Sequence, residues 1–355
     1  MKIGRKQIGI GRPVFVIAEA GVNHNNKLSL AYKMIDIASK SGADAIKFQT
    51  FLADNIQLKN STKPNYQKSI KGNYYKIIKK LESSFDMQRK LFSYCKKKNI
   101  IFLSTPYDVE SLNFLTKLGV PAFKISSSDA TNHLFLESVL RKDKPILLST
   151  GLTSLKDIDH TIKFIGKHKM RKKLVLLQTT SDYPAKNIDV NLNVIPEYIK
   201  RYKIPVGFSD HTLDHTASLG AIAMGACVVE KHFTINKKFS GPDHKASLEP
   251  PELKEWIEKI RIIEKSMGSK NKTVTNSERK NLTMRKMLVI NPAKRGTIIT
   301  KKLLTTKRVN GNGILPLQVN LKKIIGKRLV KNIALERKLS WNLIDEISDY
   351  RIFVN

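Results

Sequence analysis

The sequence has few cysteines and no long apolar segment, and both absences narrow what the protein can be. Its 355 residues include two cysteines, Cys95 and Cys227, which form no C-x-x-C pair. This excludes a disulfide framework and a thiolate zinc site, and it is typical of the reducing cytoplasm. Residues 219–229, the longest weakly apolar stretch, are too few to span a bilayer, and residues 1–20 lack the apolar core of an export signal. We therefore expect a cytoplasmic protein without a membrane segment.

Acidic residues are also scarce, at 30 Asp+Glu against 64 Lys+Arg, and the formal net charge is +34. Such an excess is the usual electrostatic footprint of a nucleic-acid-binding protein. The cations are mostly scattered lysines, however, and no RNA-binding aromatic motif, zinc-finger spacing or basic-region helix accompanies them. We therefore expect no nucleic-acid partner, and a basic nucleic-acid-binding protein or a degenerate barrel kept for binding is the non-enzymatic alternative. A positive field would also draw an anionic substrate toward an active site.

Eight short apolar runs dominate the first 235 residues, and each ends in a charged or hydrogen-bonding residue. Runs of this length, rich in β-branched and aromatic residues, are typical of parallel strands buried on both faces. Because they alternate with helix-like segments such as 28–39 and 112–118, they predict an α/β fold of the (β/α)8 TIM-barrel type. The runs are 14–19, 45–49, 100–105, 122–126, 146–150, 174–179, 206–211 and 227–232.

Beyond the barrel, the sequence predicts a linker and a small second domain. The last barrel helix is expected to follow Pro250-Pro251 and to end near Met267, so the barrel domain covers 1–267. The polar stretch 268–283 is typical of a linker. Residues 284–355 contain short β-type runs at 287–290 and 297–299 and glycine-containing turns, which predict a β-rich domain. Within the barrel, the unusually long connection over residues 50–81 predicts a lid or substrate loop.

Polar residues at the ends of the predicted strands are the candidate active-site residues, because a barrel has its active site at the carboxyl ends of its strands. His211 and His232 end the seventh and eighth strands and would lie in one pocket. Two imidazoles leave coordination positions open, which suits an exchangeable divalent ion acting as a Lewis acid. The alternative is that His232 bonds only locally. His211 and His215 have the spacing of a zinc-binding helix, but we expect a loop there.

Lys47 and Lys124 lie inside predicted buried strands, where an ammonium group without a partner is unfavourable. We expect each to meet an anion, and phosphate is the natural candidate because hydroxyl donors end the neighbouring strands. These hydroxyl residues are Ser104, Thr105, Ser126, Ser127 and Ser149. The alternative is a structural ion pair, such as Lys47 with Glu19. Asp243, in a loop beyond the eighth strand, is a candidate for binding sugar hydroxyls, or else a turn residue.

Several of these segments closely resemble motifs of the bacterial sialic acid synthases, in one order and over nearly the whole chain. The resemblance implies a (β/α)8 barrel followed by an antifreeze-like (SAF) domain at 284–355. It also implies condensation of phosphoenolpyruvate with an N-acetylated mannosamine-type sugar to give a nonulosonic acid and phosphate. The segments are 17–25 (IAEAGVNHN), 47–50 (KFQT), 104–108 (STPYD), 148–151 (LSTG), 207–212 (GFSDHT), 230–234 (EKHFT) and 240–250 (SGPDHKASLEP).

The resemblance further implies roles for individual residues. It implies a divalent metal held at His211 and His232, Mn²⁺ with Mg²⁺ or Co²⁺ as alternatives, which polarises the sugar aldehyde. C3 of phosphoenolpyruvate attacks that aldehyde, water adds at C2, and phosphate leaves. Catalytic roles are expected for Glu19 and Asp129. The residues expected to bind phosphoenolpyruvate are Lys47, Thr105, Lys124, Ser127 and Ser149, and those expected to contact the sugar, a metal-bound water or both are Glu19, Gln49, Tyr183 and Asp243. Ser209 is also expected to bind substrate.

Arg308 matches an arginine that reaches from the small domain into the barrel of the partner subunit, so the resemblance implies a domain-swapped homodimer. The chain departs from the family pattern at several positions. Asp129 replaces a glutamate, Ser128 a glycine, and Val309-Asn310 a proline-containing turn after Arg308. The sequence leaves open whether the product is N-acetylneuraminate or a legionaminate-type acid. A synthase of the pseudaminate type, or one using a phosphorylated sugar, is the enzymatic alternative.

Overall fold

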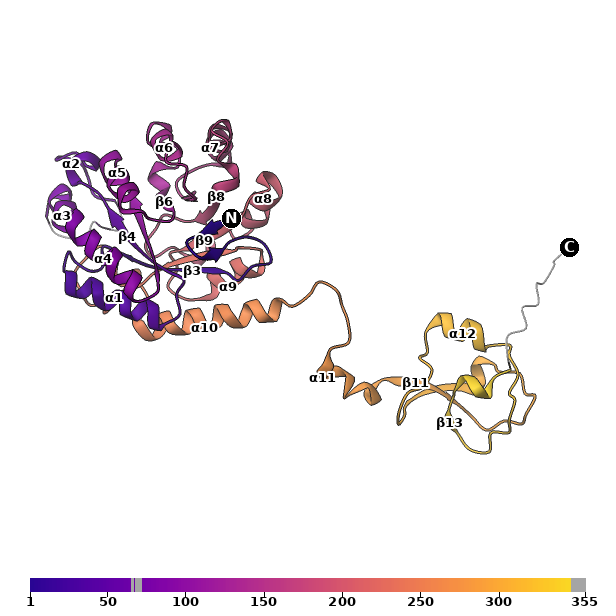
Figure 1. Cartoon of the computed structure of the whole chain (residues 1–355). Coiled ribbons are helices and arrows are strands. Elements are labelled where there is room, and N and C mark those ends of the chain that lie inside the picture. The colour runs from indigo at the N-terminus through magenta and orange to yellow at the C-terminus, as the bar shows by residue number, and fades with distance from the viewer. Residues whose placement is uncertain (65–66, 68–71, 346–355) are drawn as a thin grey trace. The chain divides into compact units, whose positions relative to one another are not determined.

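A computed structural model of the chain describes residues 1–64, 67 and 72–345 (Figure 1). The chain divides into two compact units, Met1–Gly268 and Ser269–Asn355, and each is described by itself. Eight parallel strands form the centre of the first unit, in the order β5-β4-β3-β10-β9-β8-β7-β6. The two strands that end this order, β5 and β6, lie side by side. The sheet therefore curls into a nearly closed barrel, and the predicted fold class is confirmed.

The barrel strands begin and end within two residues of the predicted apolar runs. They are β3 (Phe15–Gly21), β4 (Ala45–Thr50), β5 (Ile101–Pro106), β6 (Phe123–Ile125), β7 (Ile146–Ser149), β8 (Leu174–Thr179), β9 (Val206–Asp210) and β10 (Val228–His232). Helices cover the outside of the barrel. They are α1 (Leu28–Lys40), α4 (Phe85–Lys97), α5 (Val109–Leu118), α6 (His133–Leu140), α7 (Leu155–Lys167), α8 (Val194–Tyr202), α9 (Thr216–Ala223) and α10 (Pro250–Met267).

The long connection between β4 and α4 contains two short helices. These are α2 (Ala53–Ile56) and α3 (Tyr74–Leu81), and the side chain of Asn73 caps the second by accepting from the N–H of Lys76. Residues 65–66 and 68–71 of the predicted lid lie outside the described part of the chain. From the described part of this connection, Phe51 and Leu81 pack with Val22, which follows β3, in a small apolar cluster.

Polar side chains at the starts of the helices explain where several of them begin. Asp108 precedes α5, and its carboxylate accepts the backbone N–H of Ser111. Ser154 and Asp157 form a reciprocal capping box at the start of α7. Gly119 ends α5 with a positive φ of 84°, a conformation that glycine adopts without a steric penalty.

Alternation of side chains divides each strand between the barrel interior and the helix layer. Near the amino ends, interior positions such as Phe15, Ile101 and Val228 are apolar and form one core cluster. An N-terminal hairpin of β1 (Lys2–Ile3) and β2 (Lys6–Gln7) adds Ile3 to that cluster. Toward the carboxyl ends, the same alternation brings polar residues into the interior. The apolar part of the barrel thus supports a polar layer above it.

The second unit is a small β-rich fold. β11 (Lys286–Ile290) pairs antiparallel with β12 (Leu304–Arg308) and β13 (Arg337–Lys338). Its core includes Leu288, Ile290 and Ile324, the last from α12 (Gln318–Ile324). The run predicted at 297–299 does not form a full strand: an isolated antiparallel bridge joins Ile298 to Arg328, with backbone hydrogen bonds from Ile299 to Lys327 and from Leu329 to Thr297. The predicted linker also contains a short helix, α11 (Asn276–Arg279), started by a capping box at Thr275.

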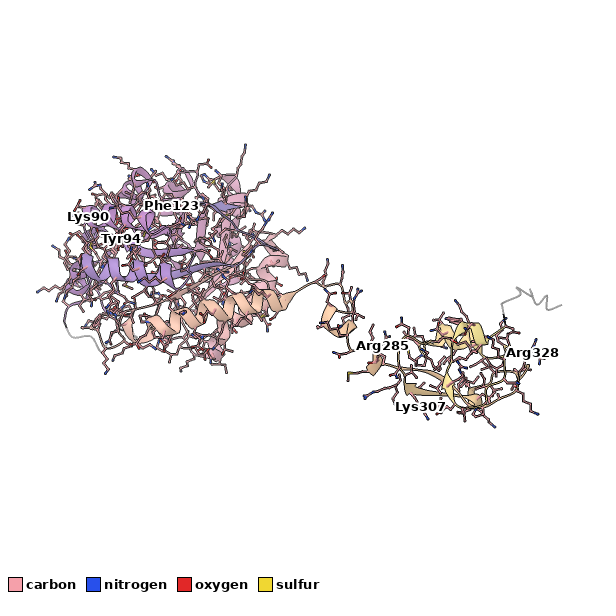
Figure 2. All side chains as sticks on the ribbon, turned by 60° about the horizontal axis from the view of Figure 1, so that its bottom comes forward. Lys90, Tyr94, Phe123, Arg285, Lys307 and Arg328 are labelled. Atoms are coloured by element: carbon pink, nitrogen blue, oxygen red, sulfur yellow. The ribbon has the colours of Figure 1, made fainter. Side chains whose placement is uncertain are left out.

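The surface of both units carries many of the cations counted in the sequence (Figure 2). Some are locally balanced, since Lys90 pairs with Asp86 and Lys307 with Glu336. Exposed pairs of this kind contribute little to stability, typically about 0–1 kcal/mol. Within the described ranges, no helix has both the length and the apolar character that crossing a bilayer requires.

Candidate active site

A cavity of about 770 Å³ opens at the carboxyl ends of the barrel strands. The barrel residues assigned a role from the family resemblance line it, whereas Arg308 belongs to the second unit. The structure therefore brings the predicted barrel residues together, and the role of each stays a prediction. They are Glu19, Lys47, Gln49, Thr105, Lys124, Ser127, Asp129, Ser149, Tyr183, Ser209, His211, His232 and Asp243. Ser104, one of the expected hydroxyl donors, does not line the cavity and bonds to Thr50 instead.

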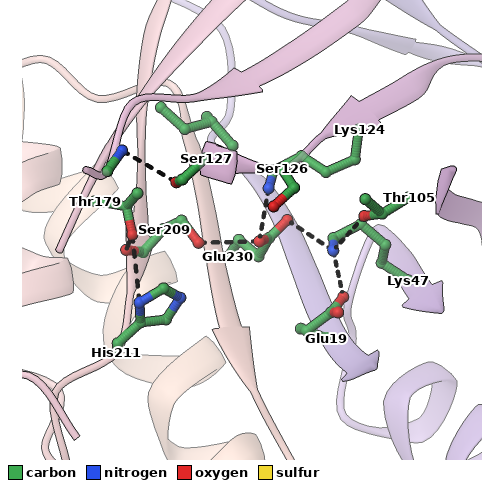
Figure 3. A network of polar contacts seen from close by, with 12 residues as sticks. Glu19, Lys47, Thr105, Lys124, Ser126, Ser127, Thr179, Ser209, His211 and Glu230 are labelled. Carbon is green, nitrogen blue, oxygen red and sulfur yellow. Dashed lines mark hydrogen bonds and ion pairs between the residues drawn. The ribbon is translucent and has the colours of Figure 1, made fainter. Parts of the chain in front are cut away.

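Two buried lysines and two buried glutamates form a charge network at the base of this cavity (Figure 3). The ammonium group of Lys47 lies 2.7 Å from Glu19 and 3.6 Å from Glu230. Lys124 lies 3.4 Å from Glu230. Both lysines therefore already have a carboxylate partner in Glu230, and the binding of a phosphate group by them stays a prediction. The alternative Lys47–Glu19 pair is present as well.

Hydroxyl groups complete this network. Thr105 accepts a hydrogen bond from Lys47 at 3.2 Å, and Ser209 donates to Glu230 at 2.9 Å. The backbone N–H of Gly151 donates to the hydroxyl of Ser127 at 3.0 Å. The buried hydroxyl oxygen of Ser149 has no hydrogen-bond partner among the described residues. An oxygen-rich anion in the cavity would supply one.

Burial and neighbouring charges set the protonation of the two glutamates. Burial raises the pKa of Glu19 to about 8, although Lys47 opposes the shift. Glu230 is also buried, but Lys124 and Lys47 together outweigh the burial and lower its pKa to about 2. Burial lowers the pKa of Lys124, and the charge of Glu230 opposes that shift. The two lysines thus face one ionised carboxylate and one carboxyl that holds its proton near neutral pH, and this arrangement favours binding of an anion.

His211 and His232 face each other across the cavity, with ring centroids 5.6 Å apart. The Nδ1 of His211 lies 2.6 Å from the carbonyl oxygen of Thr180. A carbonyl only accepts, so Nδ1 carries the proton and Nε2 keeps a free lone pair. Burial lowers the pKa of His211 to about 4 and that of His232 well below its usual value. Both imidazoles are therefore neutral, which is the form that binds a metal.

The surroundings of the two histidines leave room for a ligand between them. The buried Nδ1 of His232 has no hydrogen-bond partner among the described residues and lies 4.0 Å from the carboxylate of Asp243. The ring of Tyr183 lies 4.0 Å from that of His211 and covers one side. The described residues contain no group of three or more His, Cys, Asp or Glu side chains with metal-site geometry. A metal bound here would thus complete its coordination with water or substrate.

Two further carboxyl groups line the cavity. Burial raises the pKa of Asp243 to about 6, although Lys47 opposes the shift. Burial also raises the pKa of Asp129, whose carboxylate accepts from the side chain of Asn132 at 3.0 Å. Asp129 lies in the short 3₁₀ turn Ser127–Asp129, directly after Ser127 and Ser128. It therefore borders the serine side of the cavity.

Comparison with known proteins identifies the family. Residues 34–272 match the NeuB family. The chain belongs to that family. It is 43% identical to the N,N'-diacetyllegionaminic acid synthase of Campylobacter jejuni over 90% of this chain and 97% of that protein. It is 38% identical to the protein of the same name from Legionella pneumophila, over 96% and 98% of the two chains.

Solved structures agree with this assignment. The crystal structure of N-acetylneuraminic acid (sialic acid) synthetase from Leptospira borgpetersenii, in complex with citrate, superimposes on this NeuB protein with a TM-score of 0.70. The two chains are 34% identical, and the superposition covers 80% of this chain and 95% of the other. The expected resemblance to the sialic acid synthases is therefore confirmed.

The structure adds cavity residues to this NeuB site that the sequence reasoning did not select. Glu230 is the most important, and a signal for it existed, because it precedes His232 by two residues and so shares its face of β10. Asn132 borders the serine side, together with Ser126, which the sequence had already offered as a hydroxyl donor. Ser181 approaches Gly151 so closely that a Cβ at that glycine would clash with the serine hydroxyl. Further cavity residues come from the long β4–α4 connection, where no sequence pattern singled out individual residues. They include Asn55, Ile56, Gln57, Tyr74 and Ile78.

Proposed function

We propose that this NeuB protein is a nonulosonic acid synthase, which condenses phosphoenolpyruvate with an N-acetylated mannosamine-type sugar and releases phosphate. The observation that carries the proposal is the presence, in one cavity, of a buried lysine pair, which faces one ionised carboxylate, and a neutral histidine pair. The first suits the anionic substrate and the second a divalent metal. The names of the relatives support the same reaction class.

The lysine side of the cavity binds phosphoenolpyruvate in this proposal. Lys47 and Lys124 supply the charge for its phosphate and carboxylate groups. Thr105, Ser127, Ser149 and Ser209 supply hydroxyl donors, and the unpartnered hydroxyl of Ser149 supports this assignment. Asp129 borders the same side and is assigned a proton-transfer role at the phosphate end.

The histidine side binds the sugar. His211 and His232 would hold a divalent metal, with Mn²⁺ proposed and Mg²⁺ or Co²⁺ as alternatives, and such an ion polarises a carbonyl as a Lewis acid. The unpartnered Nδ1 of His232 supports the fit. Gln49, Tyr183 and Asp243 contact the sugar or a bound water. Glu19 holds a proton at neutral pH and is assigned the proton transfer at the aldehyde oxygen.

The bond changes follow from the two substrates. C3 of phosphoenolpyruvate forms the new carbon–carbon bond to the sugar aldehyde, and the aldehyde oxygen takes up a proton. Water then adds at C2 and loses a proton, and the bond between C2 and the phosphate oxygen breaks, so that phosphate leaves and C2 becomes the carbonyl carbon of the product. Holding both substrates in one closed cavity supplies most of the required orientation.

For the product we propose an acid of the diacetyllegionaminate type. Two relatives with that name are 43% and 38% identical to this chain. One wall of the cavity is apolar and includes Phe51, Ile56 and Ile78, which suits a 6-deoxy sugar with a second acetamido group better than one with additional hydroxyls. The cations in the described lining are the two lysines already assigned to phosphoenolpyruvate, which supports an unphosphorylated sugar.

We also propose that residues 284–355 form a SAF domain, joined to a barrel domain at 1–267 by a linker at 268–283, and that two chains form a domain-swapped homodimer. The exposed position of Arg308 at the end of β12 supports delivery of this side chain to a partner's cavity. The two free, buried cysteines support the cytoplasm as the compartment.

Phosphate release from phosphoenolpyruvate, measured with a panel of N-acetylated sugars, tests the proposed function. We expect release that depends on both substrates, and fastest turnover with the 2,4-diacetamido-6-deoxy sugar. The mass of the product identifies the acid. Release with N-acetylmannosamine alone would correct the product type, and no release with any sugar of the panel would overturn the proposal.

A further inference from the structure

Each histidine assigned to the metal follows a buried charged residue on its own strand. Asp210 precedes His211 at the end of β9, and Lys231 precedes His232 at the end of β10. These strands are adjacent and parallel, and Lys231 is the register partner of Asp210. Since side chains alternate along a strand, the histidines face the cavity while the two charged residues face the helix layer.

Asp210 and Lys231 form an ion pair that is closed off from solvent. The ammonium group of Lys231 lies 3.0 Å from the carboxylate of Asp210, and the side chains are 1% and 0% exposed. Lys231 also donates to the carbonyl oxygen of Thr212 at 2.7 Å and to its hydroxyl at 3.4 Å. Lys231 therefore binds residues on both sides of His211.

The carboxylate of Asp210 has its own complete set of partners. It accepts the backbone N–H of Thr212 at 2.8 Å and the hydroxyl of Thr212 at 2.7 Å. The hydroxyl of Ser218, in the first turns of α9, donates to it at 2.5 Å. Because one oxygen of Asp210 holds the N–H two residues ahead, the chain turns sharply at His211. The direction of the His211 side chain depends on this turn.

Stability alone does not explain such a pair. Moving two charges out of water is costly, and apolar residues of similar volume at such positions are often equally stabilising or more so. Apolar contacts do not, however, fix the relative position of two strand ends as hydrogen bonds between charged groups do. Groups that orient metal-bound histidines typically change metal affinity by about 10- to 100-fold when they are removed.

We propose that Asp210 and Lys231 are positioning residues that set the distance and direction of His211 and His232 for a divalent metal. The proposal rests on the metal site of the proposed function. Its subject is the ion pair on the outer face of the barrel, which touches neither the metal nor the substrates. It explains why a buried lysine and a buried aspartate stand directly before the two histidines.

The test compares Mn²⁺ binding by the parent protein and by the double variant Asp210→Asn/Lys231→Met. Both substitutions keep the side-chain size, and together they leave no buried charge without a partner. The free Mn²⁺ in a titration is measured by electron paramagnetic resonance, and thermal unfolding of the metal-free protein is followed by circular dichroism. We expect Mn²⁺ affinity to fall about ten-fold or more, with an unfolding midpoint close to that of the parent.

Arg261→Met is the matched control, because Arg261 pairs with the buried Asp44 at the opposite, amino end of the barrel at 3.0 Å. It should lower stability without changing Mn²⁺ affinity. Unchanged Mn²⁺ affinity in the folded double variant overturns the positioning role, and so does an equal loss in Arg261→Met. A parent protein that does not bind Mn²⁺, or binds it equally well as His211→Ala, overturns the metal site and this inference with it.

Discussion

Glu230 gives both buried lysines a carboxylate partner, and this decides what removal of Lys124 should do. In Lys124→Met, Glu230 keeps Lys47 at 3.6 Å, so we expect a folded protein without a gain in stability. The phosphoenolpyruvate site loses one charged hydrogen bond, which corresponds to a rise in its KM of about 10- to 100-fold. The KM of the sugar should change little. Phosphate release at varied concentrations of each substrate measures both, and an unchanged KM for phosphoenolpyruvate would contradict the assignment.

The histidine pair predicts a loss of turnover rather than of substrate binding alone. His211→Ala and His232→Ala should each abolish measurable phosphate release, and a chelator should do the same to the parent protein, because the proposed site has two imidazoles and either loss leaves one. His215 precedes α9 and does not line the cavity, so His215→Ala is the control and should retain most activity. Equal losses in all three variants, or full activity in chelator, would argue against this site.

At the scale of elements, the barrel strands were predictable because each is a short apolar run that ends in polar residues. The same strands show what a list of strand ends misses. Glu230 lies two residues before the end of β10, on the same face as His232. A search restricted to the last residue of each strand finds His232 and misses Glu230. Applying the two-residue period from every strand end inward would have found it.

The second unit was less predictable for a physical reason. Its core depends on loops as much as on strands, with Ile299, Ile314 and Leu329 packed from irregular segments. Such segments have no hydrophobic period to detect. β12, which carries Arg308, contains polar and exposed residues over most of its length. No apolar run in the sequence therefore indicated this strand. The resemblance to a known family, and not the local pattern, singled out that arginine.

The loop between β3 and α1 predicts a pH dependence of stability. His24 is buried there, its Nδ1 accepts the N–H of Asn26, and its Nε2 has no partner among the described residues. Burial lowers the pKa of His24 to about 4, against a usual value near 6.5. Between these values the unfolded chain binds the proton and the folded chain does not. Stability is therefore lost as the pH falls from about 6.5 toward 4, and His24 contributes about 2 kcal/mol between pH 7 and pH 5.

Urea unfolding of the parent and of His24→Gln at pH 7 and pH 5 measures this contribution. Glutamine does not titrate, so the loss of unfolding free energy between the two pH values should be smaller in the variant by about 2 kcal/mol. His211 and His232 add losses of the same sign in both proteins. His160→Gln, at an exposed position of α7, is the control for the substitution itself. Equal losses in the parent and His24→Gln would show that the ring finds a partner when protonated.

At the scale of the whole molecule, the barrel unit supplies the lysine and histidine sides of the cavity by itself. Arg308 belongs to the second unit. It is exposed at the end of β12, directly opposite Lys286 on β11. Two cations directly opposite each other on a strand pair repel. An anionic group placed against this pair would relieve the repulsion.

Mixing two inactive variants tests the swapped dimer directly. Arg308→Ala removes the arginine from the second unit, and His211→Ala removes a proposed metal ligand from the barrel. If each cavity is completed by its partner's arginine, a heterodimer of the two variants contains one cavity with both groups intact. After the variants are unfolded together and refolded, half of the chains in a random mixture pair as heterodimers, so about a quarter of the parental turnover should return. Phosphate release measures the recovery, and two differently tagged chains report heterodimer formation. If heterodimers form and the mixture stays inactive, Arg308 serves its own barrel or none.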